Sequence, residues 1–447
     1  MGKTSIRVAV IGKDGRTSAI EKCLSNSVRV GTPPIKLSDW KGEPPGKAKE
    51  NALRRAAEER PDFVVIGPEE PLAEGVVDAL QGELGIPCVG PTKSLARLES
   101  SKAFTRGLIS KYKIPGNPEY RVFHNLAGVA DYLKELRQYV VKPDGLTGGK
   151  GVKISDAHLF SIADALTYCE ELFSQSQSAV VIEERLDGEE FSLQSFCDGI
   201  HIVHMPVVQD HKRARNGDTG PNTGGMGSYS CENLSLPFLR AQHLQEARDI
   251  NEAVARALFE ETHEKYKGIL YGGFMATGNG IRLLEYNARF GDPETLNVLS
   301  ILKTDFVDIC EAIITEELHQ LPIKFEKRAT VCKYVVPEGY PERPVKDAPI
   351  DLSRVPKDSH QLKSFLAAVD EKHGQYYLTG SRAVAFVGIG KNLEEAQAVA
   401  EEAACAVRGP VFHRSDIGTR ALIQHRIAHM RALEAKSYNS TVTAKDF

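Results

Sequence analysis

Strand-like runs that end in glycine alternate with helix-like stretches along the first part of the chain. Residues 7–11 and 62–66 are apolar and stop at Gly12 and Gly67, and a helix-like stretch follows each of them. Strands that alternate with helices predict a parallel, doubly wound sheet. Ligands bind to such sheets beyond the carboxyl ends of the strands, which is where these glycine loops lie. We therefore expect a Rossmann-like α/β domain over residues 5–105.

Length and charge narrow the class of protein. A chain of 447 residues is too long for a single hydrophobic core, so we expect several domains. The net charge of −4 gives no reason to expect nucleic-acid binding. The sequence shows no secretory signal and no apolar stretch long enough to span a membrane. We expect a cytoplasmic protein with neither nucleic-acid nor membrane partners.

Two strand-like runs flank a glycine-rich segment at residues 142–152. Glycine lets backbone N–H groups approach phosphate oxygens closely, and the lysines add positive charge. A Walker A loop is excluded, because Gly151 rather than Ser or Thr follows Lys150 and a strand follows instead of a helix. A solvated hairpin turn is the alternative. The expected phosphate clamp contains Lys142, Gly148, Gly149, Lys150 and Gly151.

Acidic residues punctuate the segment 181–190. Beside a phosphate clamp, such a segment suits an adenosine site: a carboxylate accepts hydrogen bonds from ribose hydroxyls, while strand backbone groups pair with the adenine edge. The acidic residues of the segment are Glu183, Glu184, Asp187, Glu189 and Glu190. Taken alone, the segment reads as a surface hairpin.

A strand-like run at residues 281–287 ends in two oxygen ligands. Side chains alternate along a strand, so Glu285 and Asn287 should project together beside Leu283. Two such ligands suit Mg²⁺ held between protein and triphosphate, although a strand end entering solvent is the plainer alternative. The next residues, 288–294, place one cation and two acids around a turn, and such a density of charge is typical of functional sites. The charged residues of that turn are Arg289, Asp292 and Glu294.

A long loop over residues 209–227 begins with charged residues and continues with glycines and small hydroxyls. Asp210 and Lys212 lie in the first part, and Asp218 begins the second. This composition suits a loop that wraps an anionic substrate, and a disordered surface loop fits it equally well. His211 alone gives weak evidence for a base or a ligand.

The first glycine loop, residues 12–16, could bind phosphate at a helix N-terminus. It lacks the dinucleotide fingerprint, because Asp14 stands where a second glycine should be. We expect a phosphosugar contact there, with a plain tight turn as the alternative.

Together these segments resemble the phosphoribosylamine–glycine ligase (glycinamide ribonucleotide synthetase) family of ATP-grasp enzymes. The similarity covers nearly the whole chain, and its most specific motifs are residues 218–227 and 289–294. The other matching motifs are residues 67–72, 90–92, 101–105, 209–213 and 414–418.

The resemblance implies an α/β and α+β multidomain protein. The N-terminal sheet domain, residues 5–105, would be followed by an ATP-grasp domain at 106–322 whose small mobile lid covers about 122–192. A C-terminal α+β domain would occupy 323–425, and a polar tail, 426–447, is expected to fray.

The resemblance also implies residue roles. ATP would be bound by Lys102, Lys142, Gly148, Gly149, Lys150, Gly151, Glu183, Arg185, Leu186 and Glu190, with Glu183 at the adenine amino group and Glu190 at the ribose. Mg²⁺ or Mn²⁺ would be bound by Glu285 and Asn287. Catalytic roles would fall to Asp210, Lys212, Arg289 and Asp292. The substrates would be bound by Gly15, Arg16, Pro68, Glu69, Asp218, Thr219, Gly220, Asn222, Thr223, Gly224, Gly225 and Glu294.

The implied reaction joins glycine to 5-phosphoribosylamine through glycyl phosphate, releases ADP and phosphate, and belongs to purine biosynthesis. The implied assembly is a monomer or a homodimer. The sequence departs from the family where Thr17-Ser18 replaces a Glu-His pair. Two alternatives stay open: an ATP-grasp carboxylate–amine ligase with a different amine acceptor, and a non-catalytic ATP-binding pseudoligase.

Overall fold

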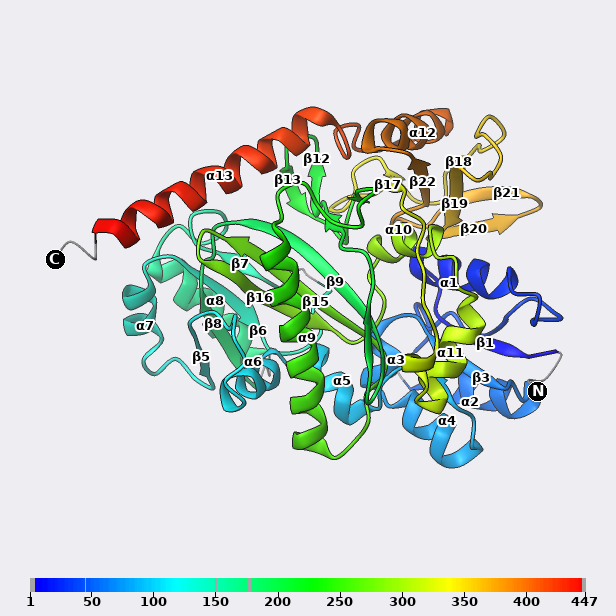
Figure 1. Ribbon diagram of the computed structural model, residues 1–447, viewed down its shortest axis with the longest axis horizontal. Coiled ribbons are helices and arrows are strands. Elements are labelled where there is room, and N and C mark those ends of the chain that lie inside the picture. Colours follow the sequence, from blue (N-terminus) through cyan, green and yellow to red (C-terminus); the bar gives the residue numbers. More distant parts are fainter. Residues whose placement is uncertain (1–4, 45, 149–150, 176–177, 444–447) are drawn as a thin grey trace.

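The computed structural model describes residues 5–44, 46–148, 151–175 and 178–443. It has an N-terminal sheet domain, an ATP-grasp domain with a separate lid, and a C-terminal domain (Figure 1). This is the predicted mixed α/β architecture. Within the described residues, every helix is too short or too polar to cross a membrane.

The N-terminal domain is a parallel sheet in the order β2-β1-β3-β4. Successive residues of β1 enter different cores: Val8 and Val10 pack on one face of the sheet, and Ala9 and Ile11 on the other. Both faces are therefore covered, which confirms the doubly wound prediction. Its elements are β1 (Val8–Ile11), α1 (Gly15–Ser25), β2 (Ile35–Ser38), α2 (Lys47–Glu59), β3 (Phe63–Ile66), α3 (Glu69–Ala73), α4 (Val76–Leu84), β4 (Cys88–Val89) and α5 (Lys93–Ser100).

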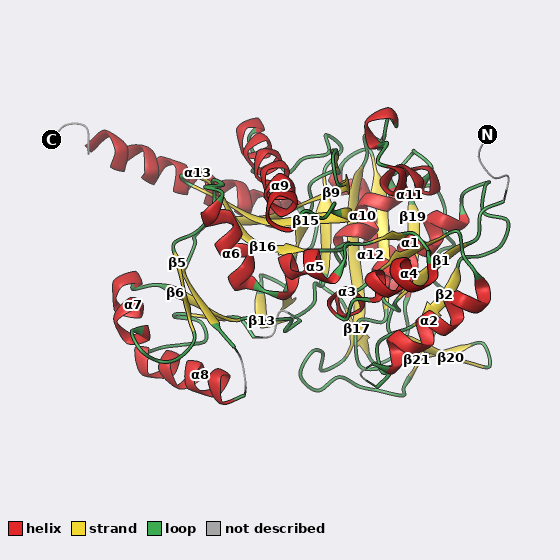
Figure 2. Cartoon of the chain, turned by 90° about the horizontal axis from the view of Figure 1, so that it is seen from below, coloured by secondary structure: helices red, strands yellow, loops and turns green. Residues whose placement is uncertain are grey.

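The lid is a four-stranded sheet in the order β5-β8-β6-β7. Figure 2 shows it with α7 and α8 as a lobe at one end of the molecule. Its apolar side chains, among them Tyr132, Val141 and Ile182, form a cluster of their own. The lid therefore shares no core cluster with the rest of the described chain. Its elements are β5 (Tyr120–Phe123), α7 (Val129–Leu136), β6 (Tyr139–Pro143), β7 (Lys153–Ile154), α8 (Ile162–Ser174) and β8 (Val180–Glu184).

A second four-stranded antiparallel sheet, in the order β10-β9-β15-β16, forms the body of the ATP-grasp domain. The strand predicted at residues 281–287 is confirmed as β16, which forms an antiparallel hairpin with β15. Helix α9 packs against these strands (Figure 1). The elements are α6 (Lys102–Lys111), β9 (Glu189–Asp198), β10 (Ile202–His204), α9 (Ala241–Thr262), β15 (Lys267–Thr277), β16 (Gly280–Asn287), α10 (Glu294–Ser300), α11 (Phe306–Thr315) and the 3₁₀ helix η1 (Leu318–Gln320).

The C-terminal sheet recruits two strands from the middle of the chain. Strand β11 pairs with β14, and β14 pairs with β17, the first long strand of the C-terminal domain. The loop between β11 and β14 thus belongs to the ATP-grasp domain in sequence, while the strands at its two ends pair within the C-terminal sheet. The remaining elements are β11 (Gln209–Asp210), β12 (Arg213–Arg215), β13 (Thr219–Asn222), β14 (Gly227–Ser230), β17 (Ala329–Pro337), β18 (Pro349–Ile350), β19 (Leu362–Leu366), β20 (Val369–Lys372), β21 (Gln375–Leu378), β22 (Val384–Gly390), α12 (Leu393–Ala406), β23 (Val411–Phe412) and α13 (Arg420–Thr443).

The expectation that residues 426–447 fray is wrong over most of that range, because α13 continues to Thr443. Ile423 and Met430 are buried, and Ile427 and Leu433 pack beside them. This helical spacing gives α13 an apolar stripe that the polar composition of the segment conceals. Figure 1 shows α13 running from the C-terminal domain over the ATP-grasp strands.

Candidate active site

Cations converge on the carboxylate of Glu285, which lies near the end of β16. Burial alone would raise the pKa of Glu285, but the field of these cations holds it below its usual value. Burial also lowers the pKa of Lys102, an effect that Glu285 partly offsets. Several cationic side chains grouped near one carboxylate suit the binding of a polyphosphate. The cations are Lys102 on α6, Lys142 on β6, and Lys212 and Arg289, which follow β11 and β16.

Glu285 and Asn287 lie on the same side of β16, with the buried Tyr286 between them. The expectation that Leu283 accompanies them is wrong. Gly273 pairs with Glu285 while Phe274 pairs with Leu283, so the strand is bulged at Leu284. A bulge resets the alternation of faces, and Leu283 packs into the core with Tyr286.

The bulge also exposes backbone carbonyls to buried cations. The guanidinium of Arg106 donates to the carbonyl oxygens of Leu283 and Leu284, at 3.0 and 2.8 Å. Lys142 Nζ donates to the carbonyl oxygen of Leu284 at 3.1 Å. Strand β16 is thereby linked to α6 and to the lid strand β6.

Glu183, which was expected to receive the adenine amino group, is buried in an ion-pair network. Arg106 donates to both of its carboxylate oxygens, at 2.7 and 2.9 Å, and Lys142 Nζ lies 2.7 Å from Oε2. Burial raises the pKa of Glu183, but Arg106 and Lys142 outweigh it and lower the pKa. The Glu183 side chain thus fixes the position of Lys142 between β8 and β16.

The remaining adenosine candidates lie between β8 and β9. Arg185 is exposed and donates to the carbonyl oxygen of Ser155 at 3.1 Å, and Leu186 is half-buried. Glu190 is exposed and accepts from Lys212 Nζ at 2.9 Å, which links the ribose candidate to the cation cluster. In the glycine-rich segment, Gly148 is exposed with φ +56°, and the carbonyl oxygen of Gly151 accepts from Tyr168 Oη at 2.7 Å. The predicted clamp residues Gly149 and Lys150 lie outside the described residues.

Arg289 reaches back to the N-terminal domain. It donates to Glu69 Oε2 at 3.0 Å and lies 2.8 Å from Glu99 Oε1. Arg16 lies 3.3 Å from the same Glu69 oxygen and donates to the carbonyl oxygen of Phe290 at 3.0 Å. Burial raises the pKa of Glu69, but Arg289 and Arg16 lower it to about 2. The arginines from distant motifs thus share one carboxylate, beside the buried Pro68 that caps α3.

Asp14 and Thr17, where the sequence departs from the family pattern, form the start of α1. The carboxylate of Asp14 accepts from the backbone N–H and the hydroxyl of Thr17, both at 2.8 Å. This is an N-cap, the usual role of Asp before a helix. A Cβ on Gly15 would lie 1.8 Å from Tyr334 Oη, so only glycine fits there. The residues that depart from the family pattern therefore cap α1, and Arg16 between them lies 3.3 Å from Glu69 Oε2.

Two carboxylates, the half-buried Asp210 and the buried Glu294, interact electrostatically near the base of the 209–227 loop. Burial first, and then the charge of Glu294, raises the pKa of Asp210 well above its usual value. Glu294, at the start of α10, accepts a hydrogen bond from Tyr271 Oη. Lys212 lowers the pKa of Asp210 in part. Acidic groups next to a cation cluster offer a site for a ligand that carries both an amine and an anion.

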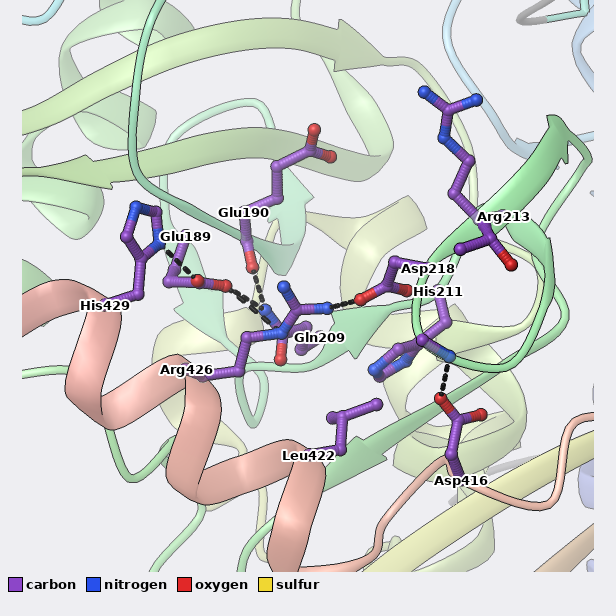
Figure 3. Close-up of polar contacts among 12 residues, drawn as sticks. Glu189, Glu190, Gln209, His211, Arg213, Asp218, Asp416, Leu422, Arg426 and His429 are labelled. Carbon is purple, nitrogen blue, oxygen red and sulfur yellow. Dashed lines mark hydrogen bonds and ion pairs between the residues drawn. The ribbon is translucent and has the colours of Figure 1, made fainter.

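The predicted substrate loop is held by arginines of the C-terminal domain. Arg382 donates to the carbonyl oxygens of Gly224 and Gly225, at 2.6 and 3.1 Å. Thr223 Oγ donates to the carbonyl oxygen of Lys212 at 2.8 Å, and Asn222 pairs with Arg213 across a short hairpin. Asp218 lies in the turn of this hairpin (Figure 3), and the exposed Thr219 and Gly220 begin its second strand.

Asp292 is engaged by protein groups. Tyr334 Oη donates to Oδ1 at 2.6 Å, and the guanidinium of Arg382 lies 3.3 Å from Oδ2. The side chain is 3% exposed. Asp292 thus joins the Arg289 motif to the C-terminal domain instead of offering an open carboxylate.

Sequence reasoning missed Arg106, Arg382 and Tyr334, because each acts through a partner distant in the chain. Arg414 lies in a motif that was noted but given no role. It donates to Asp218 Oδ1 at 2.8 Å.

Family models for phosphoribosylglycinamide synthetase match residues 6–99 as the N domain, 100–295 as the ATP-grasp (A) domain and 330–420 as the C domain. The chain belongs to this family. A phosphoribosylamine–glycine ligase of Methanosarcina barkeri is 49% identical over 83% of this chain and 84% of its own length. One of Methanocaldococcus jannaschii is 44% identical over 96% of this chain and 100% of its own.

The crystal structure of phosphoribosylamine–glycine ligase from Thermotoga maritima superposes with a TM-score of 0.76 at 27% identity, covering 92% of this chain and all of its own. As a phosphoribosylglycinamide synthetase family member with an ATP-grasp domain, the chain is an ATP-dependent ligase. The fold implies ATP binding with a divalent metal ion. Helix α13 begins at the end of the C-domain match, so nearly all of it lies beyond the family models.

Proposed function

We propose that the chain joins glycine to 5-phosphoribosylamine and forms glycinamide ribonucleotide, ADP and phosphate. The convergence of Lys102, Lys142, Lys212 and Arg289 on Glu285 carries this proposal, because it builds a polyphosphate site beside the acids of the substrate loop. The relatives' names supply the substrates. We further propose that the protein acts in the cytoplasm, as a monomer or a homodimer.

In the first step, a carboxylate oxygen of glycine attacks the γ-phosphorus of ATP, and the bond from that phosphorus to the bridging oxygen breaks. Glycyl phosphate and ADP result. Negative charge spreads over the transferred oxygens, so the cations around Glu285 would stabilise it by fixed position. Arg289 is held for this role by Glu69 and Glu99.

In the second step, the amine of 5-phosphoribosylamine attacks the acyl carbon, phosphate leaves, and the amine loses a proton. Two acids, Asp210 and Glu294, interact with each other at this site, and Asp210 also interacts with Lys212. We propose that they bind the ammonium group of glycine or the incoming amine, while Arg16 and the tip of the 209–227 loop hold the phosphosugar.

Glu285 and Asn287 fit a hard divalent cation. Among the described residues, no side chain donates a hydrogen bond to the Glu285 carboxylate, although it is half-buried among cations. Carboxylate and amide oxygens on one face of a strand are suitable ligands for Mg²⁺ or Mn²⁺. When bound, such an ion neutralises charge on the ATP phosphates.

The lid would close over the nucleotide and exclude water from the labile acyl phosphate. Its separate core supports this role, since it can move without opening the core of the other domains. Lys142 and Gly148 would move with it.

Replacing Glu285 with Ala should lower the rate of ADP release by about a hundredfold or more, because the phosphate site loses its one central carboxylate. Lys13→Ala is the matched control: Lys13 lies 3.6 Å from Asp39 and 3.5 Å from Asp370, away from the cation cluster. A coupled ADP assay with glycine and freshly made phosphoribosylamine measures both. Comparable activity in the two variants would contradict the assignment of Glu285.

A further inference from the structure

Side chains of helix α13 between Arg426 and Glu434 contact the ATP-grasp domain. The apolar stripe of the helix packs on this domain, and an ion pair adds to it: Glu434 Oε1 lies 3.1 Å from the guanidinium of Arg240. A Cβ on Gly278 would lie 2.7 Å from the carbonyl oxygen of Leu433, so the helix packs directly on the β15–β16 turn. Its first turns therefore have a defined position over the loop that begins at β11.

One side chain of α13 joins two acids that belong to different loops. The Nε of Arg426 lies 3.3 Å from Glu189 Oε2, and its NH2 group pairs with Asp218 Oδ2 (Figure 3). Glu189 is 3% exposed, and Asp218 is partly buried. A planar guanidinium can bind two carboxylates through different nitrogens, so Arg426 fixes the distance between these loops.

The first acid of this bridge adjoins the ribose candidate. Glu189 and Glu190 begin β9 and project to opposite sides, so Glu189 faces α13 while Glu190 faces away (Figure 3). His429 Nδ1 lies 2.7 Å from Glu189 Oε1, and Gln209 Nε2 donates to the carbonyl oxygen of Glu190 at 3.0 Å. Movement of Glu189 would therefore displace Glu190.

The second acid anchors the substrate loop. Asp218 has φ +52°, an uncommon conformation for a residue other than glycine, and it ends the turn that leads into β13 at Thr219. Arg414 binds its other carboxylate oxygen at 2.8 Å. Two arginines thus hold Asp218, and of these two it is Arg426 that also contacts Glu189 on the nucleotide side.

We propose that Arg426 is a positioning residue that couples the nucleotide loop at Glu189–Glu190 to the substrate loop at Asp218. Occupancy of one loop by its ligand then changes the affinity of the other. This inference rests on the proposed function, which places ATP at the first loop and the phosphosugar at the second. Coupling between two ligands is reciprocal and typically changes affinity by about 5- to 150-fold.

The test measures ADP binding by titration calorimetry with and without saturating glycinamide ribonucleotide. We expect a clear ratio of ADP affinities in the unaltered chain, and a ratio near one in Arg426→Gln and Arg426→Lys. Lysine keeps the positive charge near the buried Glu189 but lacks the planar fork that binds both acids. It therefore separates bridging from simple charge compensation, and it keeps the test valid if the Gln variant fails to fold.

Glu434→Gln is the matched control, because it removes an ion pair of the same helix without touching either loop. It should keep the ratio of the unaltered chain. An unchanged ratio in a folded Arg426→Lys variant, no ratio in the unaltered chain, or an equal loss in Glu434→Gln would overturn the proposal. Failure of the proposed function is distinct from these outcomes, since it appears as no ADP release from the unaltered chain with glycine and phosphoribosylamine.

Discussion

At the residue scale, His211 is a buried imidazole without a hydrogen-bond partner among the described residues. It is 1% exposed and lies against the ring of Tyr229. Burial first, and then the charge of Arg414, lowers its pKa to about 3, although Asp218 and Asp416 oppose this. The histidine is therefore neutral in the folded protein, and it is not placed as a base.

This burial should make the protein less stable in acid. The unfolded chain binds a proton at His211 below about pH 6.5 while the folded chain does not, so acidification favours unfolding. Between pH 7 and pH 5, His211 should account for about 2 kcal/mol of lost free energy of unfolding. His211→Phe should remove that part of the loss, as measured by urea unfolding at both pH values. The exposed His425, replaced by Gln, is the control, and an unchanged pH dependence in His211→Phe would contradict this account.

The residues of the proposed phosphate site could be singled out individually from the sequence, but their partners could not. Glycines, lysines and the Glu285–Asn287 pair stand out along the chain because their chemistry is local. The Arg106–Glu183 pair does not, because its members are 77 positions apart and their pairing depends on how α6 meets β8. Glu183 was accordingly predicted as an adenine ligand, and only the structure showed its ion pairs with Arg106 and Lys142.

At the element scale, Arg106 joins α6 to β8 and to the bulge of β16. Arg106→Met should lower the free energy of unfolding by about 3–5 kcal/mol, because it leaves the buried Glu183 with only Lys142 to compensate its charge. Chemical denaturation measures the loss. Arg54→Met, which removes only an exposed ion pair with Glu58, should cost at most about 0.5 kcal/mol. Equal effects of the two substitutions would show that the Arg106 network contributes little.

The elements themselves follow from local pattern where that pattern is strong. Alternating strands and helices predicted the N-terminal sheet, and the strand at residues 281–287 was predicted correctly. Two features were not predicted from the sequence. The bulge at Leu284 depends on pairing with β15, and α13 hides four apolar residues, Ile423, Ile427, Met430 and Leu433, among polar neighbours.

At the scale of the whole molecule, the order of the domains along the chain was predictable. The packing of the domains against one another, and the strands that cross between them, were not. One large core links the N-terminal, ATP-grasp and C-terminal domains, whereas the lid keeps its own. Strands β11 and β14 leave the middle of the chain to enter the C-terminal sheet. Such long-range pairing has no local signature, yet it is what places the 209–227 loop between domains.

The central claim is that one site activates glycine with ATP and passes it to phosphoribosylamine. ADP release should be measured with glycine alone, with freshly made phosphoribosylamine alone, and with both. The account predicts sustained ADP release, with stoichiometric glycinamide ribonucleotide, only when both are present. Equal release without phosphoribosylamine, or ATP binding with no release under any condition, would contradict it.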